Sequence, residues 1–267
     1  MEHAREGDAD VKPGARDPRP HGGNTLAVGR SAWRSRLALL LLVVLVGSAL
    51  GNLAHAQSAP GHGVRTIYLV RHGVYDEDDA ADPDVGKALI PEGREQARLT
   101  AARLAGLPVH IDALYASTMT RARQTAEILG TALKLAPRPL TDIRECTPPT
   151  DRKDVLAGET PGEPDSCRQR LERAYARLIR PSPDRDSAEV VVCHGNVIRW
   201  FTCRALGADP MLWLHMATTN CGITTIQVRP DGRLRLVGYS DVGHLPPALQ
   251  TTAWHRRASG DSTAKRP

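Results

Sequence analysis

The stretch TIYLVRHG, residues 66–73, decides the fold and raises the first question about function. Its apolar run is typical of a buried β-strand. The run stops at Arg71, a cation, and at His72, an imidazole, and Gly73 follows with no side chain. A buried strand that ends in this way predicts a polar site at the edge of a sheet, where Gly73 lets a ligand approach closely.

The chain beyond this stretch alternates strands with helices. The helices predicted from apolar periodicity cover residues 91–107, 119–133, 164–179 and 196–206. The further strands predicted are 113–116, 189–193 and the two arms of a hairpin within residues 223–239. We therefore expect an α/β fold, a three-layer α/β/α sandwich with a mostly parallel sheet and an antiparallel hairpin.

The composition is that of an ordinary globular protein. Of the 267 residues, 41% are hydrophobic and 24% are charged. The formal net charge is +5 at pH 7, part of it near the N-terminus, which is too small to indicate a nucleic acid or a membrane surface as partner. Only 4% of the residues are aromatic, so the core must consist mainly of Leu, Val, Ile and Ala.

The N-terminal region reads as a targeting region. Residues 1–29 are rich in Gly, Pro and charge and are expected to be disordered, unless translation starts near Val28. Residues 30–56 begin with three arginines, continue with an uncharged apolar stretch and end in Ala-His-Ala, the order of parts in a secretory signal peptide. An uncleaved membrane anchor is the alternative, although the apolar stretch is short against the roughly 20 residues of a membrane span.

Both interpretations of this segment predict an exported protein. A cleaved segment predicts a periplasmic or secreted domain, and an uncleaved one predicts a domain anchored outside the cytoplasm. Residues 57–63 are expected to be a linker, residues 64–249 a single domain, and residues 250–267 a flexible polar tail.

The five cysteines bear on the redox environment. Their odd number excludes a fully paired set within one chain. Cys193 and Cys203 are expected to be core thiols. Cys146 and Cys167 lie in loop-like sequence or at a helix start, and a disulfide between them in an oxidising compartment stays open. No two cysteines have the spacing of a zinc site.

Chemically active side chains recur where the predicted strands end, the edge at which such sheets bind ligands. Arg71 and His72 end one strand, His194 ends another, and the helix that follows the strand at 113–116 carries Arg121. Guanidinium groups and helix N-termini bind phosphate oxygens. An imidazole among them can attack phosphorus and become a phosphohistidine. The pattern therefore predicts an anion pocket with a nucleophile inside it.

Several sequence blocks carry a resemblance to a known family. LVRHG, YASTMTRARQTAEIL and VVVCHGNVIR resemble, in order, the signature blocks of the histidine phosphatase superfamily, which has the phosphoglycerate mutase-like fold. RECTPPTD, CHGNVIRWFTCRAL, NCGITTIQVRPDGRL and DVGHLPP are similar to its mitochondrial serine/threonine phosphatase branch, the phosphoglycerate mutase family member 5 type. The resemblance spans roughly residues 64–245 and marks residues 64–249 as a histidine phosphatase domain.

The resemblance implies the roles of individual residues. His72 would be the phosphorylated nucleophile, Glu145 would protonate the leaving alkoxide, and His194 would stabilise the transition state. The residues implied to hold the phosphoryl group are Arg71, Arg121, His194, Gly195 and Asn196. No metal ion and no cofactor are expected, because arginine and histidine supply the positive charge.

We therefore expect a metal-independent phosphomonoester hydrolase that acts through phosphohistidine, and the resemblance implies a serine/threonine phosphoprotein as substrate. An exported phosphatase of sugar phosphates or nucleotides is one alternative, and a phospho-binding scaffold domain is another. The stretch VYDEDD after Gly73 lacks the Ser and Asn that mutases carry there, which disfavours a glycolytic mutase. No nucleic acid is expected as partner, a membrane only if the N-terminal segment is uncleaved, and the oligomeric state stays open.

Other polar features receive a structural interpretation. Arg123 is expected to be solvated or ion-paired, and Arg199 to brace the fold. The acidic stretch 76–84 lacks the spacing of an EF-hand and is expected to be a solvated loop at the rim of the site. Ile90, which precedes Pro91, is expected to be a weak helix cap.

Overall fold

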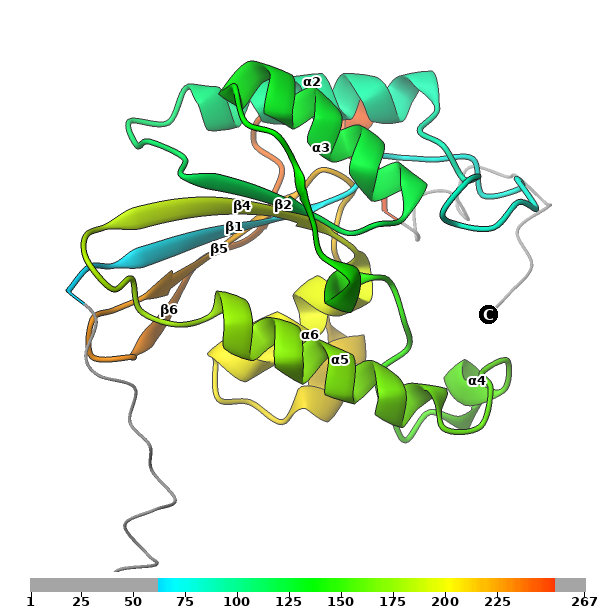
Figure 1. Ribbon diagram of the computed structural model, residues 1–267. Helices are drawn as coiled ribbons and strands as arrows, with labels where there is room; N and C mark the ends of the chain where they lie inside the picture. Colours follow the sequence, from blue (N-terminus) through cyan, green and yellow to red (C-terminus); the bar gives the residue numbers. More distant parts are fainter. Residues whose placement is uncertain (1–61, 253–267) are drawn as a thin grey trace, which may run out of the picture. The chain divides into compact units, whose positions relative to one another are not determined.

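The computed structural model describes residues 62–252 (Figure 1). The predictions for residues 1–29 and 30–56 lie outside this range, as do most of those for the linker 57–63 and the tail 250–267. Within the described range, no helix combines the length and the apolar character needed to cross a membrane.

A six-stranded sheet forms the centre of the domain, with the strand order β3-β2-β4-β1-β5-β6. The strands are β1 Arg65–Arg71, β2 Ala113–Ala116, β3 Arg138–Pro139, β4 Ser187–Cys193, β5 Ile223–Val228 and β6 Leu234–Asp241. β1, β2, β3 and β4 run parallel, whereas β5 pairs antiparallel with both β1 and β6. The predicted sheet, mostly parallel with an antiparallel hairpin, is confirmed.

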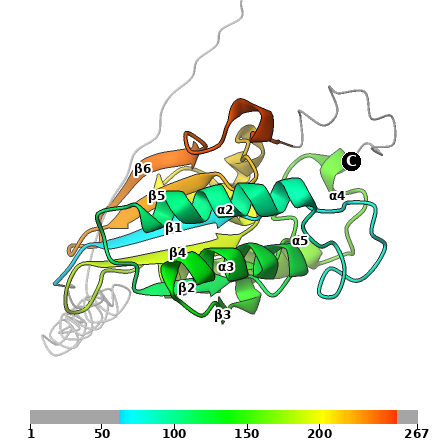
Figure 2. The same cartoon turned by 90° about the horizontal axis from the view of Figure 1, so that it is seen from above.

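Helices cover both faces of this sheet. Figures 1 and 2 show α2 (Pro91–Ala105) and α3 (Thr120–Leu133) on one face, and Figure 1 shows α5 (Glu163–Leu178) and α6 (Gly195–Ala205) on the other. The three-layer α/β/α architecture is therefore confirmed, and the ends of the predicted helices differ from the observed ones by only one or two residues. The short elements that the periodicity did not predict are β3, η2 (Thr141–Ile143), α4 (Lys153–Leu156), η3 (Pro210–His215) and η4 (Pro247–Leu249).

Two hydrophobic clusters fill the space between the layers. Successive strand residues point to opposite faces, so Val191 of β4 packs among Leu171 and Phe201, while Val192 packs among Ala101 and Ala126. Burial on both faces explains why the sequence of β4 is an uninterrupted apolar run.

A close contact between two backbones fixes the segment that leaves β1. A Cβ atom on Gly93 would lie 1.9 Å from the carbonyl oxygen of Val74, and one on Gly73 would lie 2.5 Å from the carbonyl oxygen of Gly93. The first turn of α2 therefore packs directly on the residues that follow His72. Ile90 is the N-cap of α2 and makes no side-chain capping bond, as predicted.

The open question about the cysteines has a clear answer in the structure. Cys146 and Cys167 form a disulfide that joins the loop after η2 to α5. Cys193 and Cys203 are free and buried, as predicted, and so is Cys221. The disulfide encloses residues 147–166, a segment that borders the pocket described below.

Candidate active site

The carboxyl ends of β1 and β4 bring the two predicted histidines together. Arg71 pairs with Cys193 in the parallel register, so His72 and His194, the next residues along each strand, lie side by side. Their ring centroids are 5.0 Å apart, and both side chains are buried. Ser117 follows β2, the next strand of the sheet, and its hydroxyl lies 2.7 Å from Nε2 of His194.

The hydrogen bonds of His72 define its protonation state. Its Nδ1 lies 2.8 Å from the carbonyl oxygen of Gly73, and since a carbonyl oxygen only accepts, Nδ1 carries the hydrogen. The lone pair of Nε2 then accepts from Nε of Arg121, at 3.2 Å. The imidazole is therefore neutral, with its basic nitrogen directed toward the guanidinium of Arg121.

Burial is the main reason why both imidazoles stay neutral. It holds the pKa of His72 well below its ordinary value, and His194, Arg121 and Arg71 lower that pKa further. Burial likewise holds the pKa of His194 well below the ordinary value, with a further contribution from Arg121, Arg71 and Arg144. A neutral imidazole is the form that can act as a nucleophile.

Two buried nitrogen atoms beside His72 lack a hydrogen-bond partner among the described residues. They are Nη1 of Arg121 and Nδ1 of His194. Buried polar groups are nearly always hydrogen-bonded in native proteins, so an unsatisfied pair in one place calls for an explanation. A phosphoryl group bound between the two side chains would supply oxygen atoms to such nitrogens.

Tyr75 is a member of the site that the sequence analysis did not assign. Its ring lies against the imidazole of His72, with centroids 5.2 Å apart, and the guanidinium carbon of Arg121 lies 4.7 Å from its centroid. A guanidinium over an aromatic face is attracted by the ring quadrupole. Tyr75 therefore helps to hold Arg121 in place. In the sequence, the only indication of such a role was that the stretch after Gly73 departs from the mutase pattern.

Arg71 and Gly195 lie close together at the opening of the site. Nη1 of Arg71 donates to the carbonyl oxygen of Thr218, at 2.7 Å. A Cβ atom on Gly195 would lie 3.7 Å from Nε of Arg71 and 3.1 Å from Oγ1 of Thr218. Glycine at this position therefore keeps the approach to Arg71 open.

Glu145, which the resemblance implied as the proton donor, lies at the N-terminus of α6. Its Oε1 accepts from the backbone N–H of Asn196, at 3.3 Å, and the side chain of Asn196 donates to the carbonyl oxygen of Cys146, at 2.8 Å. Burial raises the pKa of Glu145 above its ordinary value, although Arg199, Arg121 and Arg71 oppose the shift. Asn196 thus positions the Glu145 loop in this structure.

Arg199 braces the fold, as the sequence analysis predicted, and also borders the site. Its guanidinium donates to the carbonyl oxygens of Gly195 and Met216 and to the side-chain oxygen of Asn196. The guanidinium carbon lies 4.8 Å from the ring centroid of Trp213. Nothing in the sequence indicated that Arg199 and Trp213 would meet, because they belong to separate elements.

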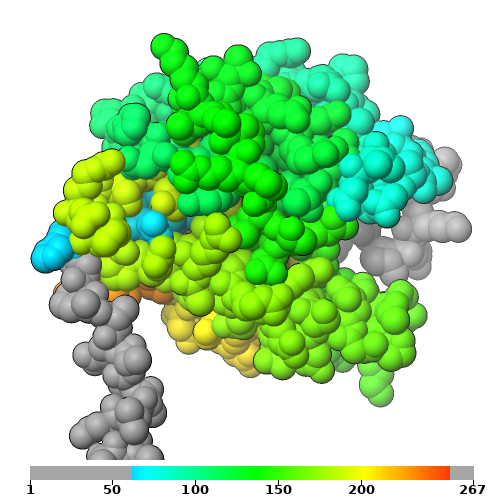
Figure 3. All heavy atoms as spheres, viewed as in Figure 1, coloured from blue at the N-terminus to red at the C-terminus, as the bar shows by residue number. Residues whose placement is uncertain are grey.

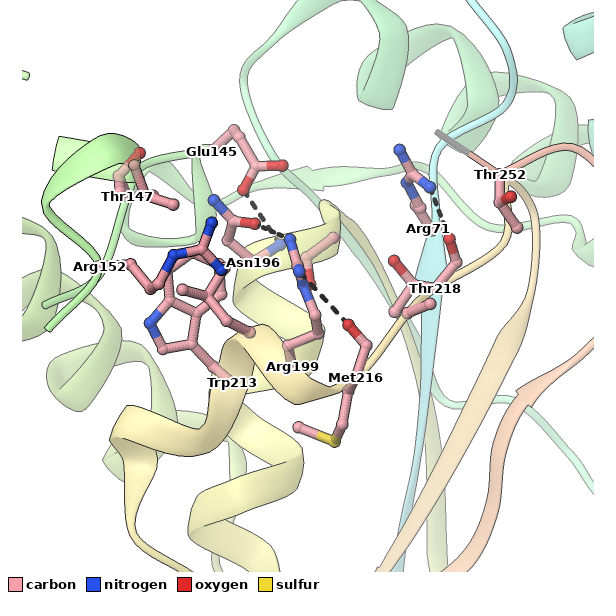
Figure 4. Close-up of a pocket in the computed structure, with 14 residues that line it drawn as sticks. Arg71, Glu145, Thr147, Arg152, Asn196, Arg199, Trp213, Met216, Thr218 and Thr252 are labelled. Atoms are coloured by element: carbon pink, nitrogen blue, oxygen red, sulfur yellow. Dashed lines mark hydrogen bonds between the residues drawn. The ribbon is translucent and has the colours of Figure 1, made fainter. Parts of the chain in front are cut away.

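A pocket of about 410 Å³ opens beside Glu145 and Arg71 (Figure 4). Figure 4 shows Glu145, Asn196 and Arg199 near its middle, Arg71 and Thr218 on one side, and Arg152, Thr147 and Trp213 on the other. The remaining residues that line it are Val155, Gly195, Leu214, Met216, Ala217 and Thr252. The pocket is thus continuous with the residues around the two histidines.

The acidic stretch 76–84 is an exposed loop at one end of the domain, as predicted (Figure 3, cyan). Hydrogen bonds within the loop hold its shape: the backbone N–H groups of Ala81 and Lys87 donate to the carboxylate of Asp79 and lower its pKa. Asp84 pairs with Arg144, and a guanidinium nitrogen of Arg123 donates to the carbonyl oxygen of Asp84. Across residues 62–252, no group of His, Cys, Asp or Glu side chains is arranged to hold a metal ion.

Comparison with known proteins identifies relatives over the whole of this region. The family model described as "Histidine phosphatase superfamily (branch 1)" matches residues 67–148 and 148–241. "Serine/threonine-protein phosphatase Pgam5, mitochondrial" of Caenorhabditis elegans is 40% identical over 192 residues, which are 68% of this chain and 65% of the relative, just under two thirds of its length. The protein of the same name from Caenorhabditis briggsae is 34% identical over 252 residues, covering 92% of this chain and 81% of the relative.

Solved structures support the same fold. Bacillus stearothermophilus YhfR superimposes with a TM-score of 0.55 at 21% identity, over 67% of this chain and 98% of that one. At this level of identity, the likeness concerns the fold alone.

The prediction of an exported, periplasmic or secreted protein was wrong, because the relatives are mitochondrial proteins. The same finding contradicts the alternative of an anchored domain outside the cytoplasm. The segment behind the prediction, residues 30–56, lies outside the described residues. That segment contains three arginines and no acidic residue, and mitochondrial targeting segments share this feature with signal peptides.

Proposed function

The chain belongs to the histidine phosphatase superfamily, branch 1, and is a phosphatase, and from this premise we propose that it hydrolyses phosphoserine and phosphothreonine in proteins through a phosphohistidine at His72. The single observation that carries the mechanism is the neutral His72, whose Nε2 lone pair faces the guanidinium of Arg121. The names of the relatives, mitochondrial serine/threonine-protein phosphatases, support the protein substrate and a mitochondrial location.

The first step forms a bond between Nε2 of His72 and phosphorus and breaks the bond from phosphorus to the ester oxygen. The leaving serine or threonine alkoxide takes the proton of Glu145, which burial favours in its protonated form. In the second step, water attacks the phosphohistidine and gives a proton to the Glu145 carboxylate. The phosphorus–nitrogen bond breaks, His72 returns to its neutral form, and inorganic phosphate leaves.

Charge on the phosphoryl oxygens is met by groups that are already in place. Arg71 and Arg121 supply guanidinium donors, and His194 supplies an imidazole nitrogen that has no other partner among the described residues. The backbone N–H of Gly195 begins α6, where the helix dipole also favours an anion. Fixed donors of this kind stabilise charge that develops in a transition state.

A phosphatase of small molecules remains the rival within the same reaction class. A purely phospho-binding scaffold is disfavoured, because His72 lies beside Arg121 and His194, and Glu145 lies close enough to Arg121 and Arg71 for both to affect its pKa. The mechanism as proposed needs no metal ion and no cofactor.

The test is hydrolysis of p-nitrophenyl phosphate, a phosphothreonine peptide and a sugar phosphate in the presence of EDTA. We expect turnover of the peptide and loss of turnover in His72→Ala. With a peptide whose phosphate is radioactive, we also expect an acid-labile label on the wild-type protein after rapid quenching. Turnover retained by His72→Ala would overturn the mechanism. A preference for the sugar phosphate over the peptide would favour a phosphatase of small molecules.

A further inference from the structure

We infer that the 410 Å³ pocket beside Glu145 is a binding site for an apolar side chain that neighbours the phosphorylated residue of a protein substrate. This inference rests on the proposed function and adds a sequence preference to it. Four observations carry it, namely the position of the pocket, the chemistry of its wall, the state of its charged groups and its size.

The position of the pocket matches the direction in which the leaving group of the substrate must extend. Glu145 has to reach the oxygen that leaves phosphorus, so the group attached to that oxygen must extend past Glu145. Glu145 and Arg71 line the pocket together with Gly195 and Val155. Figure 4 shows Trp213 on the far side of the pocket from Arg71. The pocket therefore receives whatever is joined to the leaving oxygen, and in a protein substrate this is the peptide on either side of the phosphoserine or phosphothreonine.

An apolar part makes up much of the wall of the pocket. It consists of Trp213, Val155, Leu214, Met216 and Ala217. The indole N–H of Trp213 donates to the carbonyl oxygen of Pro149, at 2.9 Å, so the ring offers no free donor to a ligand. A wall of this kind favours a side chain that leaves water when it binds.

Three cations line the pocket: the proposed mechanism assigns Arg71 to the phosphoryl group, and Arg152 and Arg199 are already engaged. Arg152 forms a two-point ion pair with Asp154, and both side chains are well exposed, so a second anion would gain little from Arg152. The guanidinium of Arg199 donates to Gly195, Met216 and Asn196. An acidic ligand side chain would therefore lose its water without gaining a free cation.

Polar ligands with many hydroxyl groups meet the same difficulty. The side-chain amide of Asn196 donates to Cys146, and its oxygen accepts from Arg199. The hydroxyl of Thr147 donates to Glu159. A sugar would thus bury hydroxyl groups against protein groups that already have hydrogen-bond partners, whereas an aliphatic side chain would not.

The volume of the pocket lies within the usual range of ligand pockets, about 300–1,000 Å³, and suits one or two side chains.

The experiment compares phosphoserine peptides of one sequence that differ only in the residue next to phosphoserine. This residue is Leu, Asp, Lys or Gly, tested before and after the phosphoserine with the full chain. We expect kcat/KM to be about tenfold higher for Leu than for Asp or Lys on at least one side, the size of effect that a hydrophobic pocket gives. Equal values for the four residues on both sides would overturn the inference.

Two valine variants place the preference in this pocket. Val155→Asp puts a carboxylate into the wall and should reduce the Leu-to-Gly ratio of kcat/KM by about tenfold, mainly through KM. Val109→Asp, at an exposed valine before β2 and hence at the opposite edge of the sheet, should leave the ratio as it is. An unchanged ratio in Val155→Asp would overturn the inference, as would an equal fall in both variants.

The outcomes also separate this inference from the proposed function. Hydrolysis of every peptide at one rate would remove the pocket preference and leave the protein phosphatase standing. No hydrolysis of any peptide, together with turnover of a sugar phosphate, would overturn both.

Discussion

Arg121 and His72 share a hydrogen bond in which the guanidinium Nε–H donates to the imidazole Nε2, at 3.2 Å. A lone pair that accepts from a permanent cation cannot also hold a proton, so the contact adds to burial in keeping the imidazole neutral. A phosphoryl group that binds to Nε2 must displace this hydrogen bond. The guanidinium then turns from the nitrogen to the phosphoryl oxygens, and Tyr75, which lies under it, limits where it can go.

Replacing Arg121 by Lys should lower kcat by about 10²–10³-fold, because an ammonium cannot reproduce the planar donors of the guanidinium. Steady-state kinetics with a phosphothreonine peptide checks the loss. Arg123→Lys, an exposed position on the same helix, is the matched control and should retain nearly full activity. Equal effects of the two changes would contradict the role given to Arg121.

The imidazoles of His72 and His194 should remain neutral at pH values where a free histidine is half protonated, about 6.5. Burial and the neighbouring cations lower both pKa values, so the neutral form persists as the pH falls through that range. Ring-carbon NMR of the free protein between pH 8 and pH 5.5 measures this directly, with signals assigned from His72→Asn and His194→Asn. A midpoint at or above 6.5 for either ring would refute the prediction.

Glu145→Gln should slow the hydrolysis of a phosphoserine peptide by about 10²–10⁴-fold and that of p-nitrophenyl phosphate far less. An alkoxide needs a proton as it leaves, whereas p-nitrophenolate is stable without one. The measurement is the ratio of kcat values for the two substrates. Glu127→Gln, an exposed acid on α3, is the control, and a uniform loss on both substrates would argue against proton donation by Glu145.

Glu145 should also lower the stability of the folded protein at neutral pH. Its pKa is raised in the folded state, so its contribution to the free energy of unfolding is fully present below the unfolded pKa of about 4.3 and is lost as the pH rises through the folded value. Glu145→Gln should therefore match the wild type in Tm near pH 4 and exceed it at pH 8. A lower Tm of the variant at pH 8 would show that the three arginines outweigh burial.

The Cys146–Cys167 disulfide should support both the fold and the site. It closes a span of 21 residues, for which the chain-entropy model gives roughly 3 kcal/mol. Cys146 also follows Glu145 directly, so a loose loop would misplace the proton donor. Cys146→Ser/Cys167→Ser should lower Tm and slow peptide hydrolysis more than p-nitrophenyl phosphate hydrolysis.

The effect of a reductant on the wild type supplies the control for that comparison. Dithiothreitol should move the wild type toward the double variant in both measurements and leave the variant unchanged. The thiols of Cys193, Cys203 and Cys221 are buried and free, so they do not confuse the result. If dithiothreitol changes neither the rates nor the Tm of the wild type, the prediction is contradicted.

The sequence predicted the parts of the site that depend on strand order. Strand β1 ends at Arg71 and β4 at Cys193, and parallel strands place their carboxyl ends at one edge, so the meeting of His72 and His194 followed from local pattern. The helices were predicted because their apolar periodicity is long. The short elements, such as the two-residue β3 and the four-residue α4, give too few residues for a period to be read.

Contacts between distant segments could not be predicted in this way. Trp213 meets Arg199, Tyr75 meets Arg121, and Cys146 meets Cys167 only because of how the loops pack on the sheet. No local propensity encodes such pairs. The wrong prediction of export has a different origin, since a basic segment followed by an apolar one serves more than one targeting route.

Whether Cys146 and Cys167 are bonded in a given sample of this protein depends on how that sample was prepared. Protein recovered from a reducing cytosol, or stored with a thiol, would hold two cysteines where an oxidised sample holds one cross-link. Two laboratories could then assay the same polypeptide and report different rates for peptides while agreeing on a chromogenic ester. A free-thiol count of three or five would tell the two preparations apart before any kinetic comparison is made.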